Sequence, residues 1–401
     1  MAATIKVTNI QEASSATTNL ALDSSGNVTV GNNQTVAGTL SVTGASTFTG
    51  NVTAAGTLAM ASSFKRNRII NGNMLIDQRN AGAAVTPTDG SYMVDRWFYQ
   101  SSQASKFTAQ QNAGAVTTAI GFPNYLGMTV ATAVTVGASD YFLIAQKIEG
   151  FNFADFAWGT ANAKTITLSF QVYSSLTGTF GGSLVNSAST RSYPFSYTVS
   201  SANTWTSISV TIAGDTTGTW VGSTNGVGVS VRFGLGTGST FNGTAGAWAT
   251  ANYVSATGAV SIVGTSGATF YITGVQLEVG TKATPYEMQI YSDQLAQCQR
   301  YYYFCNALSY FNGNSGNATV ARGGVSFPVP MRVAPTTITV NSGASFGGTT
   351  GYAYVSNTNS TTQINVVQTS TVNGFDTIGY SGNLPSSSYV YAISYKAEAE
   401  L

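Results

Sequence analysis

With 401 residues, the chain is long enough for two or three domains, and its 16 basic and 15 acidic residues leave a net charge of only +1. This balance gives no electrostatic reason to expect binding to nucleic acid or to an acidic membrane. The absence of His removes the most common general base and the most common metal ligand. Charged residues make up only 8% of the chain, and Gly, Tyr and Phe are abundant. This composition is typical of an all-β structural or adhesive protein whose surface is made polar by hydroxyl groups.

Residues 1–25 form a short head with two or three strand-like runs. No basic stretch followed by an apolar one opens the chain, and no run approaches 18 apolar residues. We therefore expect synthesis in a cytoplasm without the usual export signal, and no membrane span. An adhesive composition without such a signal suggests a virion component that is released by lysis. The head resembles the N-terminal segments with which tailed-bacteriophage fibres dock on other tail or baseplate proteins.

Glycine then returns every six residues, at Gly38, Gly44, Gly50 and Gly56. Apolar and Ser/Thr residues alternate between the glycines, as in very short strands with one apolar face. Such strands cannot bury that face alone, whereas three copies around one axis would each supply one side. We interpret residues 26–63 as an intertwined trimeric β-stalk; a flexible linker is the alternative. The residues expected on the axis are Leu40, Val42, Phe48, Val52, Leu58 and Met60.

Residues 64–286 contain many strand-like runs separated by loops rich in Gly, Ser and Thr. This pattern, without a convincing helix, predicts a β-sandwich of the jelly-roll kind. The basic residues at its start are interpreted as charges flanking a first strand, because no second basic patch follows. The predicted strands are Asp95–Tyr99, Tyr125–Val136, Tyr141–Ile148, Lys164–Val172, Trp205–Ile212, Gly226–Phe233 and Thr269–Val279.

Four stretches of this region are distinctive: NRIINGNMLIDQRNAG, the DRW at Asp95–Trp97, QKIEG at Gln146–Gly150, and FYITGVQLEVGTKATPYE at Phe270–Glu287. They resemble the jelly-roll module of phage tail-fibre proteins, which is itself similar to carbohydrate-binding modules. The resemblance covers residues 64–300 and implies a fold and a virion role. It implies no particular ligand, because one fold serves many functions.

Residues 287–305 form the one good helix candidate, with apolar residues at alternating three- and four-residue spacing. This seam predicts a short axial helix that packs on the threefold axis. Cys298 and Cys305 are expected to be small buried hydrophobes, since the chain has no other Cys and no His to complete a metal site. The helical residues expected on the axis are Met288, Tyr291, Leu295, Cys298 and Tyr302.

Residues 306–401 are interpreted as a distal β-rich tip domain, with a host-facing surface that is rich in Tyr. Tyr352 and Tyr354 are two apart and therefore share one face of a strand. The predicted strands are Val325–Val329, Thr336–Val340, Tyr352–Val355, Thr362–Val367 and Tyr389–Tyr395.

Catalytic chemistry has little support in this sequence. Polysaccharide hydrolysis needs two carboxylates flanking the scissile bond, and the nearest acidic pairs in the sandwich are Asp89 with Asp95 and Glu149 with Asp155. We expect no enzymatic activity and no cofactor. A structural Ca²⁺ is compatible with a jelly roll, but no ligand spacing indicates one.

The sequence therefore predicts a homotrimeric phage tail fibre that adheres to host-surface glycans. Glycan recognition uses aromatic faces together with hydroxyl and amide partners. The candidate glycan-binding residues are Tyr352, Tyr354, Trp248 and Tyr253. The alternative is a purely architectural fibre or decoration protein, and a depolymerase is third.

Overall fold

The computed structural model describes residues 9–10, 20–22, 28–30, 65–313, 320–342, 350, 352–355, 360–368, 370–380 and 390–401. The chain divides into two units, residues 1–61 and 62–401, which are described separately here. In the first unit, the short strands β1 (Asn9–Ile10), β2 (Leu20–Leu22) and β3 (Val28–Val30) pair antiparallel. The rest of the predicted head and stalk, including all six predicted axis residues before 61, lies outside the described residues. The trimeric stalk therefore stays a prediction.

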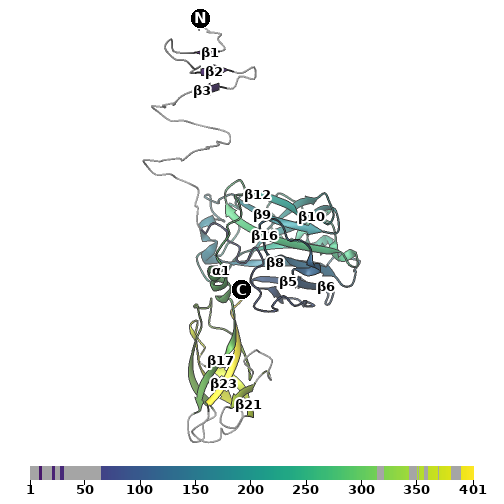
Figure 1. Ribbon diagram of the computed structural model, residues 1–401. Helices are drawn as coiled ribbons and strands as arrows, with labels where there is room; N and C mark the ends of the chain where they lie inside the picture. The colour runs from purple at the N-terminus through teal and green to yellow at the C-terminus, as the bar shows by residue number, and fades with distance from the viewer. Residues whose placement is uncertain are drawn as a thin grey trace. The chain divides into compact units, whose positions relative to one another are not determined.

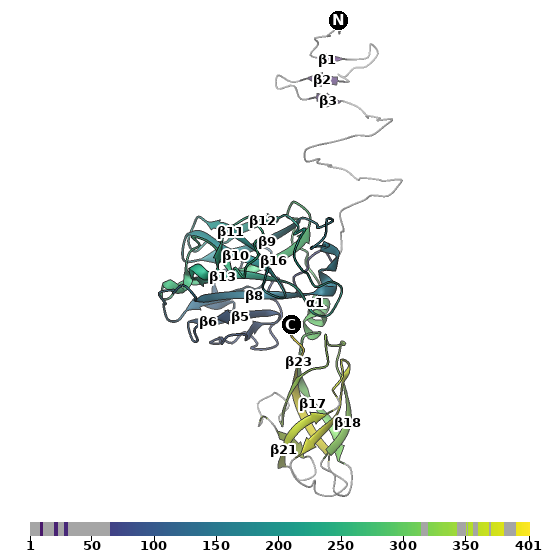
Figure 2. The same ribbon diagram turned by 180° about the vertical axis from the view of Figure 1, so that it is seen from behind.

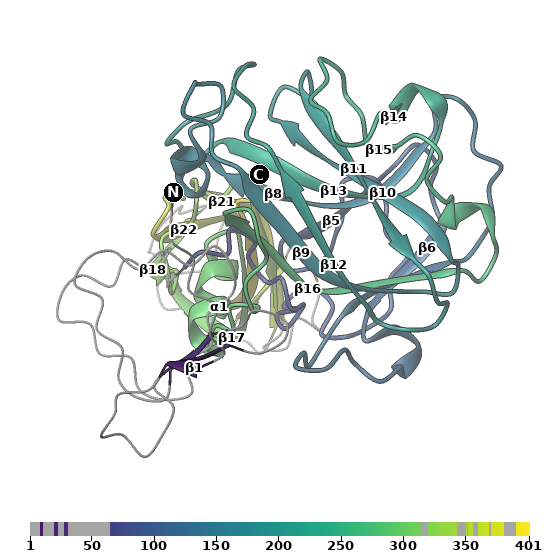
Figure 3. The ribbon, with the colours of Figure 1, turned by 90° about the horizontal axis from the view of Figure 1, so that it is seen from above.

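The second unit begins with a β-sandwich, and the predicted all-β class is confirmed (Figure 1). Its two sheets form adjacent layers when seen from above (Figure 3). One sheet contains, in spatial order, β11 (Ser192–Val199), β10 (Gly178–Asn186), β13 (Val227–Thr237), β8 (Tyr141–Glu149), β5 (Trp97–Ser101) and β4 (Tyr92–Val94). The other contains β12 (Thr206–Ile212), β9 (Ile166–Ser174), β16 (Thr269–Val279), β7 (Leu126–Val130) and β6 (Phe107–Gln111). Short elements complete the sandwich: the parallel pair β14 (Asn242–Gly243) and β15 (Ser255–Ala256), and the 3₁₀ turns η1 (Ala113–Ala115), η2 (Gly150–Asn152), η3 (Ala154–Phe156), η4 (Ser239–Phe241) and η5 (Ile262–Gly264).

Strand β9 shows why the sequence folds into two layers. Leu168, Phe170 and Val172 are buried in the core between the sheets. Ser169 and Gln171 alternate with them and point to the outer face, where they are half-buried. This period of two places apolar groups inside and hydroxyl or amide groups outside. The same alternation marked β9, β12 and β16 in the sequence, and the bounds of β16 are those that were predicted.

Strand β10 was not predicted, because its sequence GTFGGSLVN has three glycines, which are depleted in strands, and only two β-branched residues. Its glycines serve close packing instead. A Cβ at Gly182 would lie 2.5 Å from the Phe195 ring and 2.3 Å from the carbonyl oxygen of Arg232. Strands β6 and β11 were missed as well. Their places depend on pairing with distant neighbours and not on local pattern.

The helix is shorter than predicted. Helix α1 spans Tyr291–Gln299, and strand β17 (Tyr302–Gly313) follows almost at once, so the expected helix over 287–305 is wrong at both ends. Ile290 has an extended backbone before the helix begins. The run of aromatic residues from Tyr301 onward favours a strand, as aromatic residues generally do. The three–four spacing therefore crosses a helix end and does not form one continuous helical seam.

The distal part of the unit is a second β-sheet structure with its own core (Figure 2). Strand β23 pairs along one edge with β17, and along the other with β19 and β20. Phe327, Phe375 and Tyr395 pack together in the core of this sheet. The spatial order of the whole sheet, starting from β17, is β18 (Val320–Ser326), β22 (Gly374–Tyr380), β21 (Ser360–Gln368), β20 (Tyr352–Val355), β23 (Val390–Glu398) and β19 (Thr337–Asn341).

The end of β23 returns to the sandwich and forms an ionic cluster, which we call the clasp (Arg79, Asp95, Arg96, Glu398 and Glu400); all its members except Glu398 are largely buried. Arg79 forms ion pairs with Glu398 at 3.1 Å and with Glu400 at 2.9 Å. Glu400 also pairs with Arg96, which is only 1% exposed. The Arg79 guanidinium lies 3.8 Å from the centroid of the Tyr302 ring. Several of the few charged residues of this chain thus join the sandwich to the distal sheet.

Candidate functional site

The outer face of the five-stranded sheet carries a groove of about 320 Å³ whose lining contains no charged residue. Its floor is a ladder of polar side chains on β9 and β12. Gln171 lies directly opposite Ser207 in the register, and the two side chains hydrogen-bond at 2.7 and 3.0 Å. Ser169 lies opposite Ser209 one step along the same face. The ladder therefore presents neutral donors and acceptors in rows set by strand pairing.

One wall of the groove depends on a glycine. Gly274 lies at an irregularity in β16 with φ +62°, and a Cβ there would lie 2.5 Å from the Phe122 ring. The missing side chain lets Phe122 lie directly on the sheet. Phe122 in turn meets Tyr286 edge to face, with ring centroids 5.1 Å apart. Phe122 and Tyr286 come from segments 164 residues apart, and both line the groove.

Along the same sheet face lies an aromatic shelf made of Tyr125, Tyr173, Trp205 and Tyr271. Tyr173 and Tyr271 are opposite one another in the register and stack at 5.3 Å with an interplanar angle of 6°. Trp205 contacts Tyr173 and Tyr125 at centroid distances of 5.5 and 5.4 Å. Tyr173 and Trp205 are half-buried, whereas the other two are buried. Tyr173 is two residues from Gln171 on β9, so shelf and ladder share one continuous face.

The two sandwich residues predicted for glycan binding have packing roles. Trp248 packs edge to face against Trp158 and Trp220 at 4.9 and 5.4 Å, and its indole N–H donates to the carbonyl of Ala213. The Tyr253 ring covers Gly243, where a Cβ would lie 2.3 Å from the ring. Both remain half-buried, but neither lines the groove.

The other predicted residues lie away from the groove. Tyr352 is half-buried on β20, and the side chain of Tyr354 lies outside the described residues. Met288 and Tyr291 are 57% and 59% exposed, whereas Cys298 is buried, which raises the pKa of its thiol well above the usual value. Leu295 is half-buried. Tyr302 is buried under Arg79 in β17, so it does not continue the seam of α1. An axial role for these side chains stays a prediction.

The four carboxylates of the two acidic pairs considered for catalysis each form a hydrogen bond or an ion pair with another part of the protein. Asp89 accepts a hydrogen bond from the backbone of Ser101 at 2.9 Å, and Asp155 pairs with Arg68 at 2.8 Å. Asp95 belongs to the clasp. Glu149 accepts from Arg300 at 3.0 and 2.6 Å and from the Tyr301 hydroxyl at 2.7 Å. In the described part of the chain, no three acidic or Cys side chains converge as metal ligands, and no helix could span a membrane.

The distinctive sequence stretches meet at the base of the sandwich and build its framework. Asn71 donates to the backbone carbonyl of Asp95, and the Trp97 indole donates to the carbonyl of Asn71. Gln146 exchanges two hydrogen bonds of 2.8 Å with the backbone of Ile70. Gln276 accepts from the backbone of Glu287 at 2.8 Å. These hydrogen bonds join the stretches to one another, and none of the residues that form them lines the groove.

No protein-family model matches the chain, and no curated protein matches it. Among solved structures, it is similar to the enzymatically active domain of tailspike protein 4 from bacteriophage CBA120, at 11% identity and a TM-score of 0.30. That match covers 54% of this chain and 22% of the tailspike chain. It is also similar to TmCBM61 in complex with β-1,4-galactotriose, at 10% identity and a TM-score of 0.28, over 54% of this chain and 99% of that one. A family 11 carbohydrate-binding module from Clostridium thermocellum, in complex with a mixed-linked tetrasaccharide, matches at 12% identity and a TM-score of 0.25, over 49% and 97%. Likenesses at this level identify neither a family nor a ligand.

Proposed function

We propose that this chain is an adhesive tail fibre of a tailed bacteriophage and that the groove on the five-stranded sheet binds neutral glycans. The observation that carries the glycan part is the pairing of an uncharged polar ladder with an aromatic shelf on one sheet face. A sugar presents hydroxyl groups around its edge and C–H groups on its faces. Serine hydroxyls and the Gln171 amide can hydrogen-bond to the sugar hydroxyl groups, and aromatic rings can stack on the C–H faces.

The fibre part of the proposal rests on the four distinctive stretches and on the six-residue glycine period of the predicted stalk. Three chains joined by the stalk would present three grooves, and weak sites gain avidity in this way without any new contact. The head would dock on other virion proteins. The face of β20 that carries Tyr352 and Tyr354 is a second proposed contact region for the host surface.

We also propose that the chain does not hydrolyse its ligand, since the four carboxylates closest to a catalytic arrangement each have a structural partner. Host polysaccharide incubated with the protein should keep its chain length. New reducing ends that disappear on Asp89→Asn or Asp155→Asn substitution would establish a depolymerase instead.

Binding of the intact protein to arrayed neutral oligosaccharides, together with adsorption to host cells, tests the adhesive role. Trp205→Ala and Gln171→Ala should each weaken binding. For Trp205→Ala we expect a loss of affinity of about 2- to 10-fold, because one stacked ring is worth ~0.5–1.5 kcal/mol. Gln103→Ala, on a loop away from the groove, is the matched control and should bind normally. Thermal unfolding confirms that each variant is folded. If both groove variants bind and adsorb like the parent protein, the fibre is architectural or its adhesive surface lies elsewhere.

A further inference from the structure

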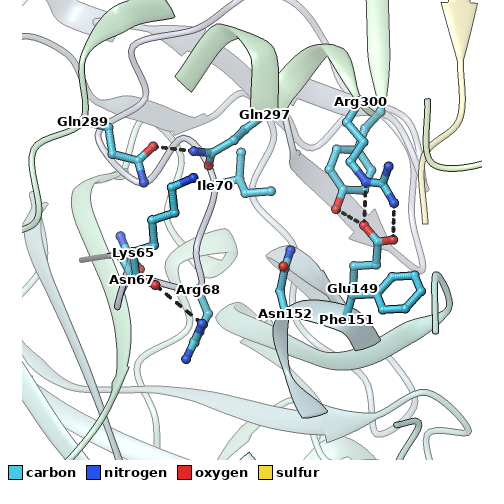
Figure 4. Close-up of a pocket in the computed structure, with 11 residues that line it drawn as sticks. Lys65, Asn67, Arg68, Ile70, Glu149, Phe151, Asn152, Gln289, Gln297 and Arg300 are labelled. Atoms are coloured by element: carbon cyan, nitrogen blue, oxygen red, sulfur yellow. Dashed lines mark hydrogen bonds and ion pairs between the residues drawn. The ribbon is translucent and has the colours of Figure 1, made fainter. Parts of the chain in front are cut away.

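A second cavity, of about 460 Å³, lies at the base of the sandwich and is distinct from the groove. We call it the junction pocket. Three segments form it: residues 65–70 before the first strands, the end of β8 with η2, and α1 (Figure 4). The residues that line it are Lys65, Asn67, Arg68, Ile70, Glu149, Phe151, Asn152, Gln289, Gln297, Arg300 and Tyr301.

Three of the chain's 16 basic residues line this one pocket. Arg300 is held by Glu149, and Arg68 by Asp155. Lys65 has no ion-pair partner among the described residues. Glu149 is the only acidic residue in the lining, and its oxygens accept from Arg300 and Tyr301. Lys65 is therefore the one cation of the lining whose side chain has no carboxylate partner among the described residues, and the nearby Glu287 carboxylate accepts from the backbone amides of Lys65 and Asn67.

The rest of the lining suits a hydroxylated ring. Gln289 and Gln297 hydrogen-bond to each other at 2.9 Å, and their remaining amide groups lie beside Lys65 in Figure 4. The Asn152 side chain is exposed on the opposite side of the pocket. Phe151 is 58% exposed and lines the pocket, so its ring face is accessible there. The pocket thus combines a free cation, amides and an accessible aromatic face.

We propose that the junction pocket binds an acidic saccharide, with a sugar carboxylate at Lys65 and hydroxyls on the amides of Gln289 and Asn152, and with Phe151 at the other end of the pocket for the ring face of a further sugar unit. This proposal does not depend on the neutral groove, which lies on a different face and has no charged lining. A carboxylate next to an ammonium gains a charge-assisted hydrogen bond, which is stronger than a neutral one.

The cationic side of the pocket is pre-formed. Burial raises the pKa of Glu149, but the hydrogen bonds from Arg300 and Tyr301 outweigh burial and hold that pKa below its usual range. Glu149 is therefore ionised at neutral pH and keeps Arg300 in place. Arg300 and Arg68 each already have a carboxylate partner, which leaves Lys65 as the group that selects the acid.

The test compares D-glucuronic acid with D-glucose, which share a ring and differ in one carboxylate. Titration of the full chain by ligand-observed NMR at low salt should show glucuronate binding about tenfold more tightly, which corresponds to roughly one charge-assisted contact. Lys65→Met should abolish this preference. Lys106→Met, outside the pocket, is the charge-matched control and should leave the preference intact.

Two further arms separate the possible explanations. Trp205→Ala should leave the glucuronate preference unchanged, because the groove is a separate site; failure of neutral glycan binding alone would therefore not affect this proposal. Acetate should bind far more weakly than glucuronate. Equal affinity for glucose and glucuronate, an unchanged preference in Lys65→Met, or acetate binding as tight as glucuronate would each overturn the assignment.

Discussion

The Glu287 carboxylate accepts hydrogen bonds from two backbone amides, those of Lys65 at 2.5 Å and of Asn67 at 2.9 Å. One side chain thus holds the first described residues of the second unit against the segment that leads into α1. Arg66 also donates to the carbonyl of Pro285 at 2.9 Å. We call the two hydrogen bonds to Glu287 the bracket. They fix the backbone of Lys65, so the position of the Lys65 side chain at the edge of the junction pocket depends on them.

Glu287→Ala should therefore loosen residues 65–68 without unfolding the sandwich. We expect a loss of about 1–3 kcal/mol, the usual range for hydrogen bonds to a charged group. The same variant should lose most of its preference for glucuronate, because Lys65 is no longer placed. Urea unfolding and the sugar titration measure the two effects, and a variant that keeps both its stability and its preference would contradict the bracket.

Arg79→Met should be strongly destabilising. It removes the cation shared by Asp95, Glu398 and Glu400, and breaking a buried ion pair from one side costs about 3–5 kcal/mol. The double variant Arg79→Met with Asp95→Asn should recover part of the loss, since the buried Asp95 carboxylate pairs with Arg79, whereas Glu400 keeps Arg96. Chemical unfolding followed by Tyr and Trp fluorescence measures both. An additive double variant would show that Arg79 and Asp95 are not coupled.

Stability should fall as the pH rises towards 7. Burial raises the pKa of Asp95 to about 7, and Arg79 offsets this only in part because it is shared with two other carboxylates. The folded state then binds a proton that the unfolded state, with its ordinary value of 3.8, has released. The contribution of Asp95 to the free energy of unfolding is therefore complete below pH 3.8. It decreases as the pH rises from 3.8 to about 7, by at most ~1.4 kcal/mol per pH unit. Asp95→Asn should remove this slope in melting temperatures measured from pH 4 to 8, and an unchanged slope would assign it to another group.

Gly274→Ala should weaken neutral glycan binding more than it weakens the fold. The positive φ itself costs ~1–3 kcal/mol for a residue with a side chain, and the new methyl group would also displace Phe122. Gly258→Ala is a matched control, because Gly258 has φ +80° and open space around it. Both variants should lose comparable stability in thermal unfolding, and only Gly274→Ala should lose affinity on the glycan array. Equal affinities would mean that the Phe122 wall does not contribute to binding.

The stalk prediction can be tested directly by mass. Val42→Asp or Val52→Asp would bring three like charges together on the axis and should break the trimer. Native mass spectrometry or light scattering of the intact chain should show three copies, and one copy for either variant. A parent protein that is a monomer or a dimer would refute the interpretation of residues 26–63.

The sequence predicted the fold better than the sites. Strand-like runs are a local signal: the one predicted over Thr269–Val279 has the bounds of β16, and the one over Lys164–Val172 begins and ends two residues before β9. The groove has no local signal: Gln171 meets Ser207 through strand register, and Phe122 meets Tyr286 across most of the sandwich sequence. The resemblance did not single out the groove either, because it implied no ligand, although its stretch Phe270–Glu287 supplies Gly274 and Tyr286 to the lining.

In residues 287–305 a local signal is present, the three–four spacing of apolar residues, but it predicts the wrong extent for the helix. Tyr302 continues the three–four spacing of α1 in the sequence, yet it belongs to β17, where its ring stacks on Arg79. A cation from a segment more than 200 residues away decides which face of that Tyr is buried. No spacing rule within residues 287–305 contains this information.

The clasp also determines how the distal sheet responds to mechanical load. Tyr302 at the start of β17 is paired in the ladder with Glu398 at the end of β23, so both connections to the sandwich lie at the same end of the two strands. One connection is covalent, through α1, and the other is ionic, through Arg79 and Arg96. Two attachment points resist rotation of the distal sheet relative to the sandwich, whereas a single covalent link allows such rotation. Opening the clasp would thus loosen this coupling and leave it to the covalent link and to hydrogen bonds such as those between Arg332 and Asn225.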